Sequence, residues 1–365
     1  MQCKESSNNS LPFILFIMKQ SQLSIEVERW KSFYMQKGIS ESKYSFYLEY
    51  ITPLLEKDMP VIFDFEHLCR LLGLKPQFIS SIINHPESFY RNFSIPKRSG
   101  GTRQILAPYY SLKYVQNWIY LNILSRIPIS GCAHGFVPKR SIVTNAQYHL
   151  SNAYLLKLDL KDFFPSIPIN YVIKVFQSQG YTYKVSTYLA SICCYEEHLP
   201  QGAPTSPTLS NIIARHMDNR LKGLAKHTHT KYTRYADDLA FSGAHIGIGM
   251  VSYIKKIVEE CGFKLNEKKI RLYNNKGSKI LTGINLSNGT LTLPRNYRRN
   301  LEQEIFYIRK YGFNSHVSHE KIRNPHYLET ILGKINFWLM IEPNNSFAQN
   351  AYQHFKQLYQ QKKNG

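Results

Sequence analysis

The sequence predicts an α+β fold, on three observations. Residues 19–90 carry apolar side chains at three- and four-residue spacing, which is typical of helices. The centre of the chain instead contains alternating or short apolar runs, such as 90–105 and 154–160, which favour strands. From about Pro294 the pattern is again helical, with a net positive charge. Helical regions on either side of a strand-rich centre are typical of the α+β class.

Composition and charge point to a polyanionic partner. The chain has 365 residues, 43% of them hydrophobic, which is enough for two or three subdomains. There are 46 Lys and Arg against 25 Asp and Glu, a formal charge of +21, and 13% of residues are aromatic. Positive charge neutralises phosphates and aromatic rings stack on bases, so nucleic acid is the predicted partner. The alternative is a basic enzyme whose charge serves only solubility.

Cysteine and hydropathy patterns predict a cytoplasmic protein with no membrane segment. The six cysteines include no CxxC pair and do not suggest a disulfide framework, and the histidines have no paired cysteines that would complete a zinc site. The apolar run at 11–18 is too short to cross a bilayer and has no cleavage site after it. Because a polar, helix-compatible stretch follows Met18, we hypothesise that translation begins there.

The first helical region is predicted to break twice and to lead into a hairpin. Turns are expected at 51–53 and 58–60, where prolines interrupt the pattern. Residues 90–105 alternate around a Gly-Gly centre and predict a β-hairpin that carries Lys97, Arg98 and Arg103. Such a basic hairpin could clamp a triphosphate, and the alternative is ordinary surface charge.

Two amphipathic helices are predicted next, at 108–127 and 141–151, followed by an apolar strand at 154–160. The run LPQGAPTSPTLSN (199–211) predicts an open loop, because its glycine and prolines disfavour regular structure. Ser206 and Pro207 are then expected as the N-cap and first residue of a helix that continues through a buried stripe to Leu224.

Three acidic residues stand at the ends of predicted strands. Asp159 ends the apolar strand in LKLDLKDFF, and Asp237 and Asp238 lie where two strands within 231–242 are expected to turn. Adjacent carboxylates repel each other and lose hydration when buried, so the arrangement disfavours folding unless a cation neutralises it. Hard oxygen ligands suit Mg²⁺, and two such ions can promote phosphoryl transfer. The alternative is a pair of exposed turn aspartates.

Beyond this turn a helix is predicted at about 247–261, and strands or strand-turn units are predicted at 262–273 and 278–286. A basic linker joins the last two segments.

The order of these motifs resembles that of reverse transcriptases. The resemblance covers about residues 90–290 and comprises the basic hairpin, LKLDLKDFF, LPQGAPTSPTLSN, YADD, GFKLNEKK and ILTG. It implies a right-hand polymerase fold with fingers, a palm built on a split βαβ sheet, and a helical thumb. The implied parts are an N-terminal helical region (1–89), fingers (90–153 and 165–200), palm (154–164 and 201–293) and a basic helical thumb (294–365).

The resemblance also implies roles for the acidic residues and for one aromatic side chain. Asp159, Asp237 and Asp238 would be catalytic and would hold two Mg²⁺ ions, with Mn²⁺ as a substitute. Asp159 and Asp237 would be the shared metal ligands and Asp238 the supporting one. Phe164 matches the aromatic residue that blocks a ribose 2′-hydroxyl, which would make deoxynucleotides the substrate. The alternative for Phe164 is core packing beside Phe163.

Further residues match positions that bind the incoming dNTP. Lys97 and Arg103 match cations of the fingers that neutralise the triphosphate. Gln201 and Gly202 match the loop that lines the nucleotide, where glycine permits close approach of the backbone. Lys269 matches a lysine proposed to protonate the departing pyrophosphate.

Within reverse transcriptases the chain resembles the bacterial retron branch. NAQYH (Asn145 to His149) fits an NAxxH element, and Leu281-Thr282-Gly283 resembles a VTG element in which leucine replaces valine. Asn145, His149, Thr282 and Gly283 are therefore expected to contact RNA. Asn145 and His149 share one helical face, so they could instead pair within the protein.

Retron membership implies particular partners and a particular product. The template would be a cognate structured non-coding RNA, and DNA synthesis would start from a guanosine 2′-hydroxyl within it. The product would be branched RNA-linked single-stranded DNA (msDNA), and a partner effector protein and a role in antiphage defence are further implications. The alternatives are a group II intron-like or other bacterial reverse transcriptase, and a non-catalytic RNA-binding scaffold with the same fold.

Overall fold

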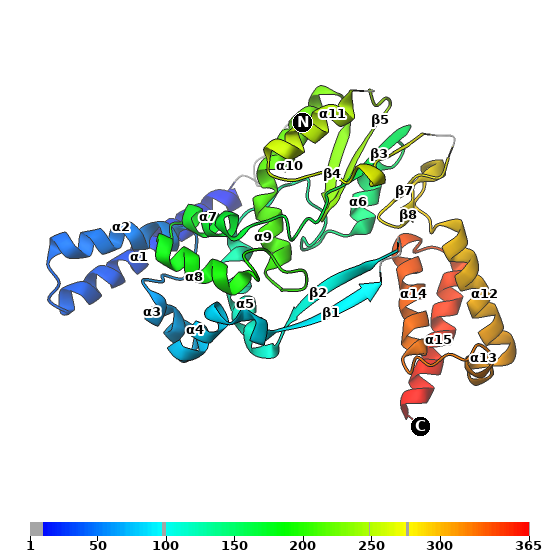
Figure 1. Ribbon diagram of the computed structural model, residues 1–365, viewed down its shortest axis with the longest axis horizontal. Helices are drawn as coiled ribbons and strands as arrows, with labels where there is room; N and C mark the ends of the chain where they lie inside the picture. Colours follow the sequence, from blue (N-terminus) through cyan, green and yellow to red (C-terminus); the bar gives the residue numbers. More distant parts are fainter. Residues whose placement is uncertain (1–9, 97–99, 248, 275–276, 365) are drawn as a thin grey trace, which may run out of the picture. The chain divides into compact units, whose positions relative to one another are not determined.

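The computed structural model describes residues 10–96, 100–247, 249–274 and 277–364 (Figure 1), and the side chains of 10–20 are among those it leaves undescribed. The chain forms two compact units, the first from residues up to 129 together with 162–215, and the second from 130–161 together with 216–365. Helices and strands both contribute, as predicted for an α+β fold. The five cysteines in the described part are free thiols, and none of the described helices is both long and apolar enough to cross a bilayer.

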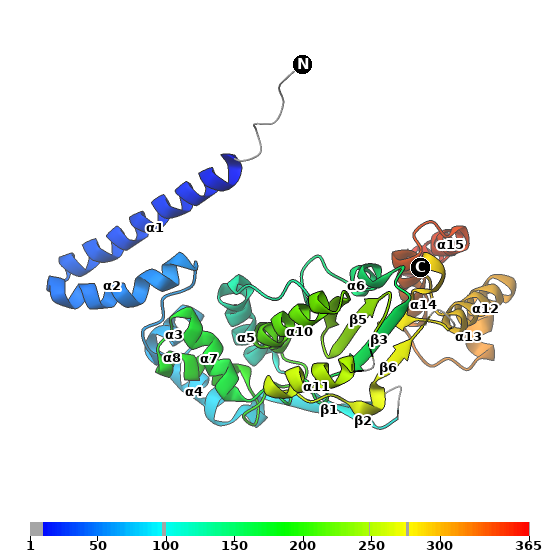
Figure 2. The same cartoon turned by 90° about the horizontal axis from the view of Figure 1, so that it is seen from above.

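The first unit is mainly helical. Its helices are α1 (Ser10–Gln36), α2 (Glu41–Glu56), α3 (Phe65–Leu72), α4 (Pro76–Asn84), α5 (Tyr110–Asn122), α7 (Ile169–Gln179), α8 (Tyr183–Cys193) and α9 (Ser206–Ile213). Helices α1 and α2 form an antiparallel pair (Figure 2). Strands β1 (Tyr90–Pro96) and β2 (Thr102–Pro108) of this unit form a hairpin, as the alternating pattern predicted.

Two predicted breaks in the helices have different outcomes. The prediction of a turn at 51–53 is wrong, because helix α2 continues through Pro53. Ile51 and Leu54 on either side are fully buried, and this packing offsets the hydrogen bond that proline cannot donate. The turn at 58–60 is confirmed, with Asp58 in the left-handed region at φ 56°.

The helix after the proline-rich loop starts one residue earlier than expected and is shorter. Thr205 is the N-cap of α9, so Ser206 and Pro207 are its first and second residues. The single stripe predicted to Leu224 is divided between α9 and α10 (Arg215–His227), with Ala214 between them.

The second unit is built on a four-stranded antiparallel sheet. Its strand order is β4 (Lys231–Tyr235), β5 (Asp238–Gly243), β3 (Tyr154–Asp159) and β6 (Arg271–Tyr273). Helix α6 (Ile142–His149) is hydrogen-bonded to Thr233 of β4, and helix α10 is hydrogen-bonded to the neighbouring residue, Tyr232. Neighbouring residues of a strand point to opposite faces, so the two helices cover opposite faces of the sheet. Helix α11 (Met250–Glu260) lies near the predicted 247–261.

The segment after α11 is less regular than predicted. Of residues 262–273 only the last three form a strand, because Glu267–Lys269 makes a 3₁₀ turn. Residues 278–286 form the short hairpin of β7 (Ile280–Leu281) and β8 (Ile284–Asn285).

The C-terminal region is helical, as predicted. It contains α12 (Arg295–Tyr311), α13 (Phe313–His319), α14 (Tyr327–Ile341) and α15 (Ser346–Asn364). Ile305, Ile331 and Trp338 are fully buried among these helices, in a core that continues into Leu281 and Ile284 of the β7–β8 hairpin. This shared core makes the hairpin and the helices one packed region of the second unit.

Candidate active site

The sheet of the second unit brings the predicted acidic residues together. In the antiparallel pairing of β3 with β5, Asp159 lies directly opposite Asp238. The Leu160 amide donates to the carbonyl of Asp237 at 2.9 Å, and the Asn266 amide donates to the carbonyl of Asp159 at 2.8 Å. Residues that are 79 positions apart in the chain are therefore held as cross-strand neighbours by backbone hydrogen bonds.

The turn between β4 and β5 has two residues, Ala236 and Asp237. The sequence placed this turn one residue later, at Asp237 and Asp238, but Asp238 already pairs with Tyr235 in the sheet. Ala236 is in the left-handed region, with φ 56°. A short connection between twisted strands favours such positive φ values, even though they are costly for residues other than glycine.

The carboxylates at this sheet edge lie in an environment that disfavours their charge. Burial raises the pKa of Asp238 to about 6; Lys157 opposes this shift, while Asp237 and Asp159 add to it. Asp159 is only 7% exposed and accepts a hydrogen bond from the Nζ of Lys269 at 2.7 Å. Partial burial lowers the pKa of Lys269, but the carboxylates, Asp159 above all, raise it overall, so this lysine stays charged.

A small pocket of about 200 Å³ opens at the same edge. Its lining consists of Lys157, Leu158, Asp159, Asp238, Lys269 and Arg271. Two carboxylates and three basic side chains thus face one space, which suits a bound anion together with a cation.

The donor atoms at this edge fit a divalent metal ion only in part. In the described part of the chain, no three or more His, Cys, Asp or Glu side chains form a group that could hold a metal by themselves. Mg²⁺, however, takes one or two protein carboxylates and completes its shell with water and substrate phosphates. Asp159 and Asp238, cross-strand partners that line the same pocket, match that incomplete type of site.

Sequence reasoning missed two of the lining residues, Lys157 and Arg271. Lys157 lies two positions before Asp159 on the same strand, so alternation puts both on one face and could have indicated it. Arg271 is the cross-strand partner of Lys157. No sequence signal indicated that pairing, because the register of β6 is set only when the sheet forms.

In the first unit, the loop before α9, which carries Gln201 and Gly202, contacts strand β2 of the hairpin. The carbonyl of Gln201 accepts a hydrogen bond from Leu106 at 2.9 Å. A Cβ on Gly202, which has φ 134°, would lie 2.6 Å from the carbonyl oxygen of Leu106. The glycine is therefore required by the approach of β2, a protein strand. Arg103 is exposed on β2, and Lys97 lies outside the described residues.

Phe164 is half-buried, and its ring lies 5.5 Å from that of Phe163, which is buried. Part of the ring stays accessible, so both the packing role and the predicted role beside a sugar remain open.

Asn145 and His149 do not face the surface, which corrects their assignment to RNA contact. Their exposed fractions are 1% and 3%. Thr233 donates its hydroxyl hydrogen to Asn145 Oδ1 at 2.5 Å, so it can only accept from Nε2 of His149, 2.7 Å away. Nδ1 of His149 then accepts from Ser242 at 2.7 Å. The NAxxH element joins α6 to β4 and β5 instead of presenting these side chains to RNA.

Thr282 and Gly283 form the turn of the β7–β8 hairpin, with φ values of 46° and 84°. The Thr282 hydroxyl is buried and has no hydrogen-bond partner among the described residues, whereas Gly283 is exposed. Their contact with RNA stays a prediction.

Comparison with known proteins agrees with the motif order. Residues 95–297, more than half of the chain, match the family model of "Reverse transcriptase (RNA-dependent DNA polymerase)". Solved structures with similarity include a telomerase from Candida albicans (10% identity, TM-score 0.40, 73% of this chain and 63% of that one). A foamy viral protease-reverse transcriptase with double-stranded DNA gives 18% identity and a TM-score of 0.38, over 68% of this chain and 36% of the other.

Curated relatives are retron enzymes. The chain is 40% identical over 232 residues to the retron Mx65 reverse transcriptase of Myxococcus xanthus, a match that covers 58% of this chain and 54% of that protein. It is 32% identical over 254 residues to the retron Ec86 reverse transcriptase of Escherichia coli, covering 68% of this chain and 79% of the relative. The match thus spans about half of the first relative and most of the second. The chain belongs to the reverse transcriptase family, with its right-hand polymerase fold, and within that family to the retron type.

Proposed function

We propose that this protein is an RNA-directed DNA polymerase of a retron, with Asp159, Asp237 and Asp238 as its catalytic carboxylates. The observation that carries the proposal is the cross-strand pairing of Asp159 with Asp238, next to Asp237 in the turn. Carboxylates from the ends of two neighbouring strands that line one pocket are what a nucleotidyl-transfer site requires. The predicted fingers, palm and thumb boundaries are part of this proposal.

Asp159 and Asp237, with Asp238 in support, would hold divalent metal ions, and Mg²⁺ is the ion that best suits hard oxygen ligands. When bound, such ions activate the attacking hydroxyl and stabilise the charge on the departing pyrophosphate. Because the pKa of Asp238 is about 6 without a bound metal ion, protons compete with the metal for this side chain below that pH. Activity should therefore fall as the medium is acidified through pH 6.

The basic side chains of the pocket would bind the triphosphate. Lys157, Lys269 and Arg271 line the space beside the carboxylates and offer charge-assisted hydrogen bonds to phosphate oxygens. In this structure Lys269 donates a hydrogen bond to Asp159. We propose that it exchanges this partner for a phosphate when nucleotide binds, which would keep a lysine near the leaving group.

The residues that match the other dNTP-binding positions of the family would supply the remaining nucleotide contacts. Arg103 on the exposed hairpin, and Lys97, would neutralise the triphosphate. Gln201 and Gly202 would line the nucleotide, and Phe164 would exclude a ribose 2′-hydroxyl. In this proposal dNTPs are the substrates.

The retron relatives support the more specific part of the proposal. We propose that the template is a structured non-coding RNA, primed from one of its own guanosine 2′-hydroxyls, and that msDNA is the product. A formal charge of +21 favours tight RNA binding. An effector partner and a role in antiphage defence belong to the same proposal.

The chemistry is tested with Asp237→Asn. This variant should lose at least about a thousandfold in dNTP incorporation on a primed RNA, because it removes charge at the metal-binding edge. Its RNA affinity should stay within about twofold, since RNA binding depends on phosphate contacts elsewhere. The control is Glu66→Gln, the same chemical change on an exposed helix, which should leave synthesis unchanged. Full-length synthesis by Asp237→Asn would refute the site.

The assignment to the retron branch of reverse transcriptases is tested by identifying the nucleic acid that copurifies with the protein from its host. RNA joined to complementary DNA through a 2′,5′ linkage would support the retron assignment. Linear complementary DNA would favour another kind of bacterial reverse transcriptase. RNA alone, together with no incorporation by the wild-type protein, would favour the non-catalytic scaffold.

A further inference from the structure

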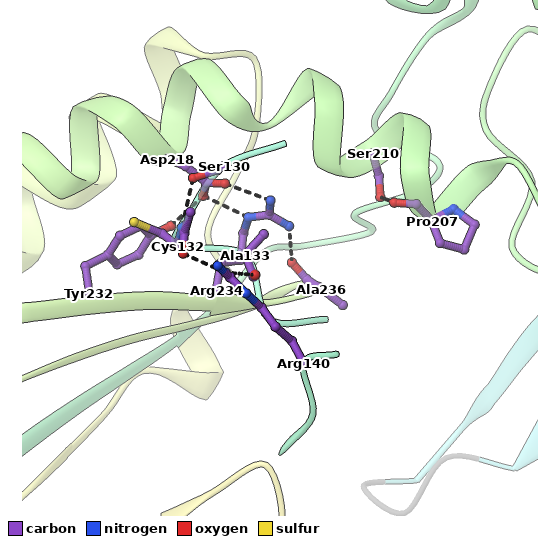
Figure 3. Close-up of polar contacts among 11 residues, drawn as sticks. Ser130, Cys132, Ala133, Arg140, Pro207, Ser210, Asp218, Tyr232, Arg234 and Ala236 are labelled. Atoms are coloured by element: carbon purple, nitrogen blue, oxygen red, sulfur yellow. Dashed lines mark hydrogen bonds and ion pairs between the residues drawn. The ribbon is translucent and has the colours of Figure 1, made fainter. Parts of the chain in front are cut away.

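A fully buried arginine lies directly beside the carboxylate turn. Arg234 lies on β4, two positions before Ala236 of the turn, and both Arg234 and Asp218 of α10 are 0% exposed. Nε and Nη2 of Arg234 donate to the two carboxylate oxygens of Asp218, each at 2.8 Å (Figure 3). A charge that is taken out of water must be paired and hydrogen-bonded, and this two-pronged contact meets that requirement.

Tyr232 completes the pair. Its hydroxyl donates to Oδ1 of Asp218 at 2.8 Å (Figure 3). Burial raises the pKa of Tyr232 well above its ordinary value, and Asp218 raises it further, so the hydroxyl keeps its proton. Asp218 therefore accepts three hydrogen bonds, and the guanidinium has little freedom to move.

The remaining nitrogen of the guanidinium holds the turn. Nη1 of Arg234 donates to the carbonyl oxygen of Ala236 at 3.1 Å. Ala236 is the residue with positive φ between β4 and β5, and the next two residues are Asp237 and Asp238. The buried pair thus fixes the peptide from which the two carboxylates extend.

A second contact holds the turn from residues 130–135. This segment runs parallel to β4: the amide of Arg234 donates to Cys132 at 2.9 Å, and the carbonyl of Arg234 accepts from His134 at 2.7 Å. Arg140 stabilises this segment, because its Nη1 donates hydrogen bonds to the carbonyls of Gly131 and Ala133. At its end lies Gly135.

Gly135 leaves no room for a side chain against the turn. A Cβ there would lie 2.5 Å from the amide nitrogen of Ala236 and 3.1 Å from the carbonyl carbon of Tyr235. These are backbone atoms, so any side chain at position 135 must displace the turn itself. Gly131, four residues earlier, has nothing within 4 Å of its Cβ position.

We infer that Arg234, held by Asp218, and Gly135 are positioning residues, which set the Ala236–Asp237 turn and thereby the geometry of the carboxylates. The inference rests on the proposed function for its catalytic consequence, though not for its effect on metal binding. The physical reason is that a displacement of about 1 Å at a reacting centre can cost about a hundredfold in rate. None of these residues needs to touch substrate.

The test compares Gly135→Ala with Gly131→Ala in the full-length protein. Gly135→Ala should lower kcat for dNTP incorporation at least about tenfold, with RNA affinity and the KM for dNTP within about twofold. Its affinity for Mn²⁺ alone, measured from the free-ion electron paramagnetic resonance signal, should fall several-fold. Gly131→Ala should match the wild type in every measurement. Unchanged kcat and Mn²⁺ affinity in folded Gly135→Ala would overturn the inference.

A second variant decides the outcome if Gly135→Ala fails to fold. Arg234→Lys keeps a positive charge beside Asp218, but a single ammonium cannot grip the carboxylate and reach the Ala236 carbonyl as the planar fork does. It should lower kcat and Mn²⁺ affinity in the same way. Wild-type values for both would overturn the inference.

The Mn²⁺ readout separates this inference from the proposed function. If the wild-type protein does not incorporate dNTPs, the proposed function fails, while a loss of Mn²⁺ binding in Gly135→Ala relative to wild type and Gly131→Ala would still support the positioning role. If the wild type is active and the folded variants are too, the positioning role alone is wrong.

Discussion

Two clusters of charged residues lie within a few residues of each other on the same sheet, and they are built in opposite ways. Around Asp218 and Arg234 the opposite charges pair at 2.8 Å, the carboxylate has three donors, and both side chains are 0% exposed. At the sheet edge, Asp159 and Asp238 face each other as like charges, and the burial of Asp238 is strong enough to raise its pKa to about 6.

The difference separates charges that serve the fold from charges that we propose serve chemistry. A buried pair whose hydrogen bonds are satisfied within the protein gives a rigid, unchanging geometry. The carboxylates at the sheet edge are paired only in part: Asp159 accepts one hydrogen bond, from Lys269, which leaves lone pairs for a ligand from outside the chain, and the burial of Asp238 costs the unliganded protein stability. The first cluster supports the second through the Ala236 carbonyl.

The largest expected effect on stability comes from breaking the paired cluster. Asp218→Ala should lower the free energy of unfolding by about 3–5 kcal/mol, because it leaves the Arg234 charge buried without a partner. The double variant Asp218→Leu, Arg234→Met should recover most of this loss, since apolar side chains of similar volume can replace a buried pair. Urea denaturation measures both.

The double variant should nevertheless remain impaired in dNTP incorporation, because methionine cannot donate to Ala236. Recovered stability together with wild-type synthesis would show that the pair serves the fold alone. A loss of less than about 1 kcal/mol in Asp218→Ala would contradict the burial argument.

A smaller effect is expected at His149, which joins α6 to the sheet. Burial above all, with contributions from His134 and Lys231, lowers its pKa from 6.5 to about 3. The unfolded chain therefore binds a proton that the folded protein does not, and the stability present above pH 6.5 is lost as the pH falls towards 3.

Replacing His149 with Gln removes this titration. Between pH 6.5 and 4.5, the free energy of unfolding of the wild type should fall more steeply than that of the variant, by up to about 1.4 kcal/mol per pH unit. His134, whose pKa is lowered to about 4, is present in both proteins. The folded variant should bind RNA like the wild type. Equal pH slopes, or a selective loss of RNA affinity, would restore the surface role for His149.

The smallest effect on stability is expected at the facing carboxylates. Here removing the charge should raise the free energy of unfolding instead of lowering it. The pKa of Asp238 is raised from 3.8 to about 6, so the fold is favoured while this group is protonated and disfavoured once it ionises. With metal removed by a chelator, Asp238→Asn should be more stable than the wild type by about 1–2 kcal/mol near pH 8.

This gain should disappear below about pH 4, where the wild-type carboxyl is protonated in both folded and unfolded states. Added Mg²⁺ should also reduce it by stabilising the wild type. Thermal melts at several pH values measure the difference. A variant that is less stable than the wild type at pH 8 would show that Asp238 is paired in a way that stabilises the fold.

The carboxylates proposed as catalytic could be located at strand ends from the sequence because their signals are local. Asp159 ends an apolar strand, and Asp237 and Asp238 lie in or beside a turn between two others, so strand patterns alone placed all three at strand ends. The ordered motifs then indicated the family, which the comparisons show. The helical ends of the chain and the basic hairpin followed in the same way from periodicity.

What the sequence did not determine is which distant side chain each residue meets. Helical spacing put Asn145 and His149 on one face, but only the packed sheet decided that this face turns inward, towards Thr233 and Ser242. The glycine at 202 indicated a close approach, and the fold decided that Leu106 makes it. No local sequence signal predicts that Arg234 pairs with Asp218. Periodicity reports whether a side chain is buried, whereas the register and packing that choose its neighbour arise only when segments far apart in the chain come together.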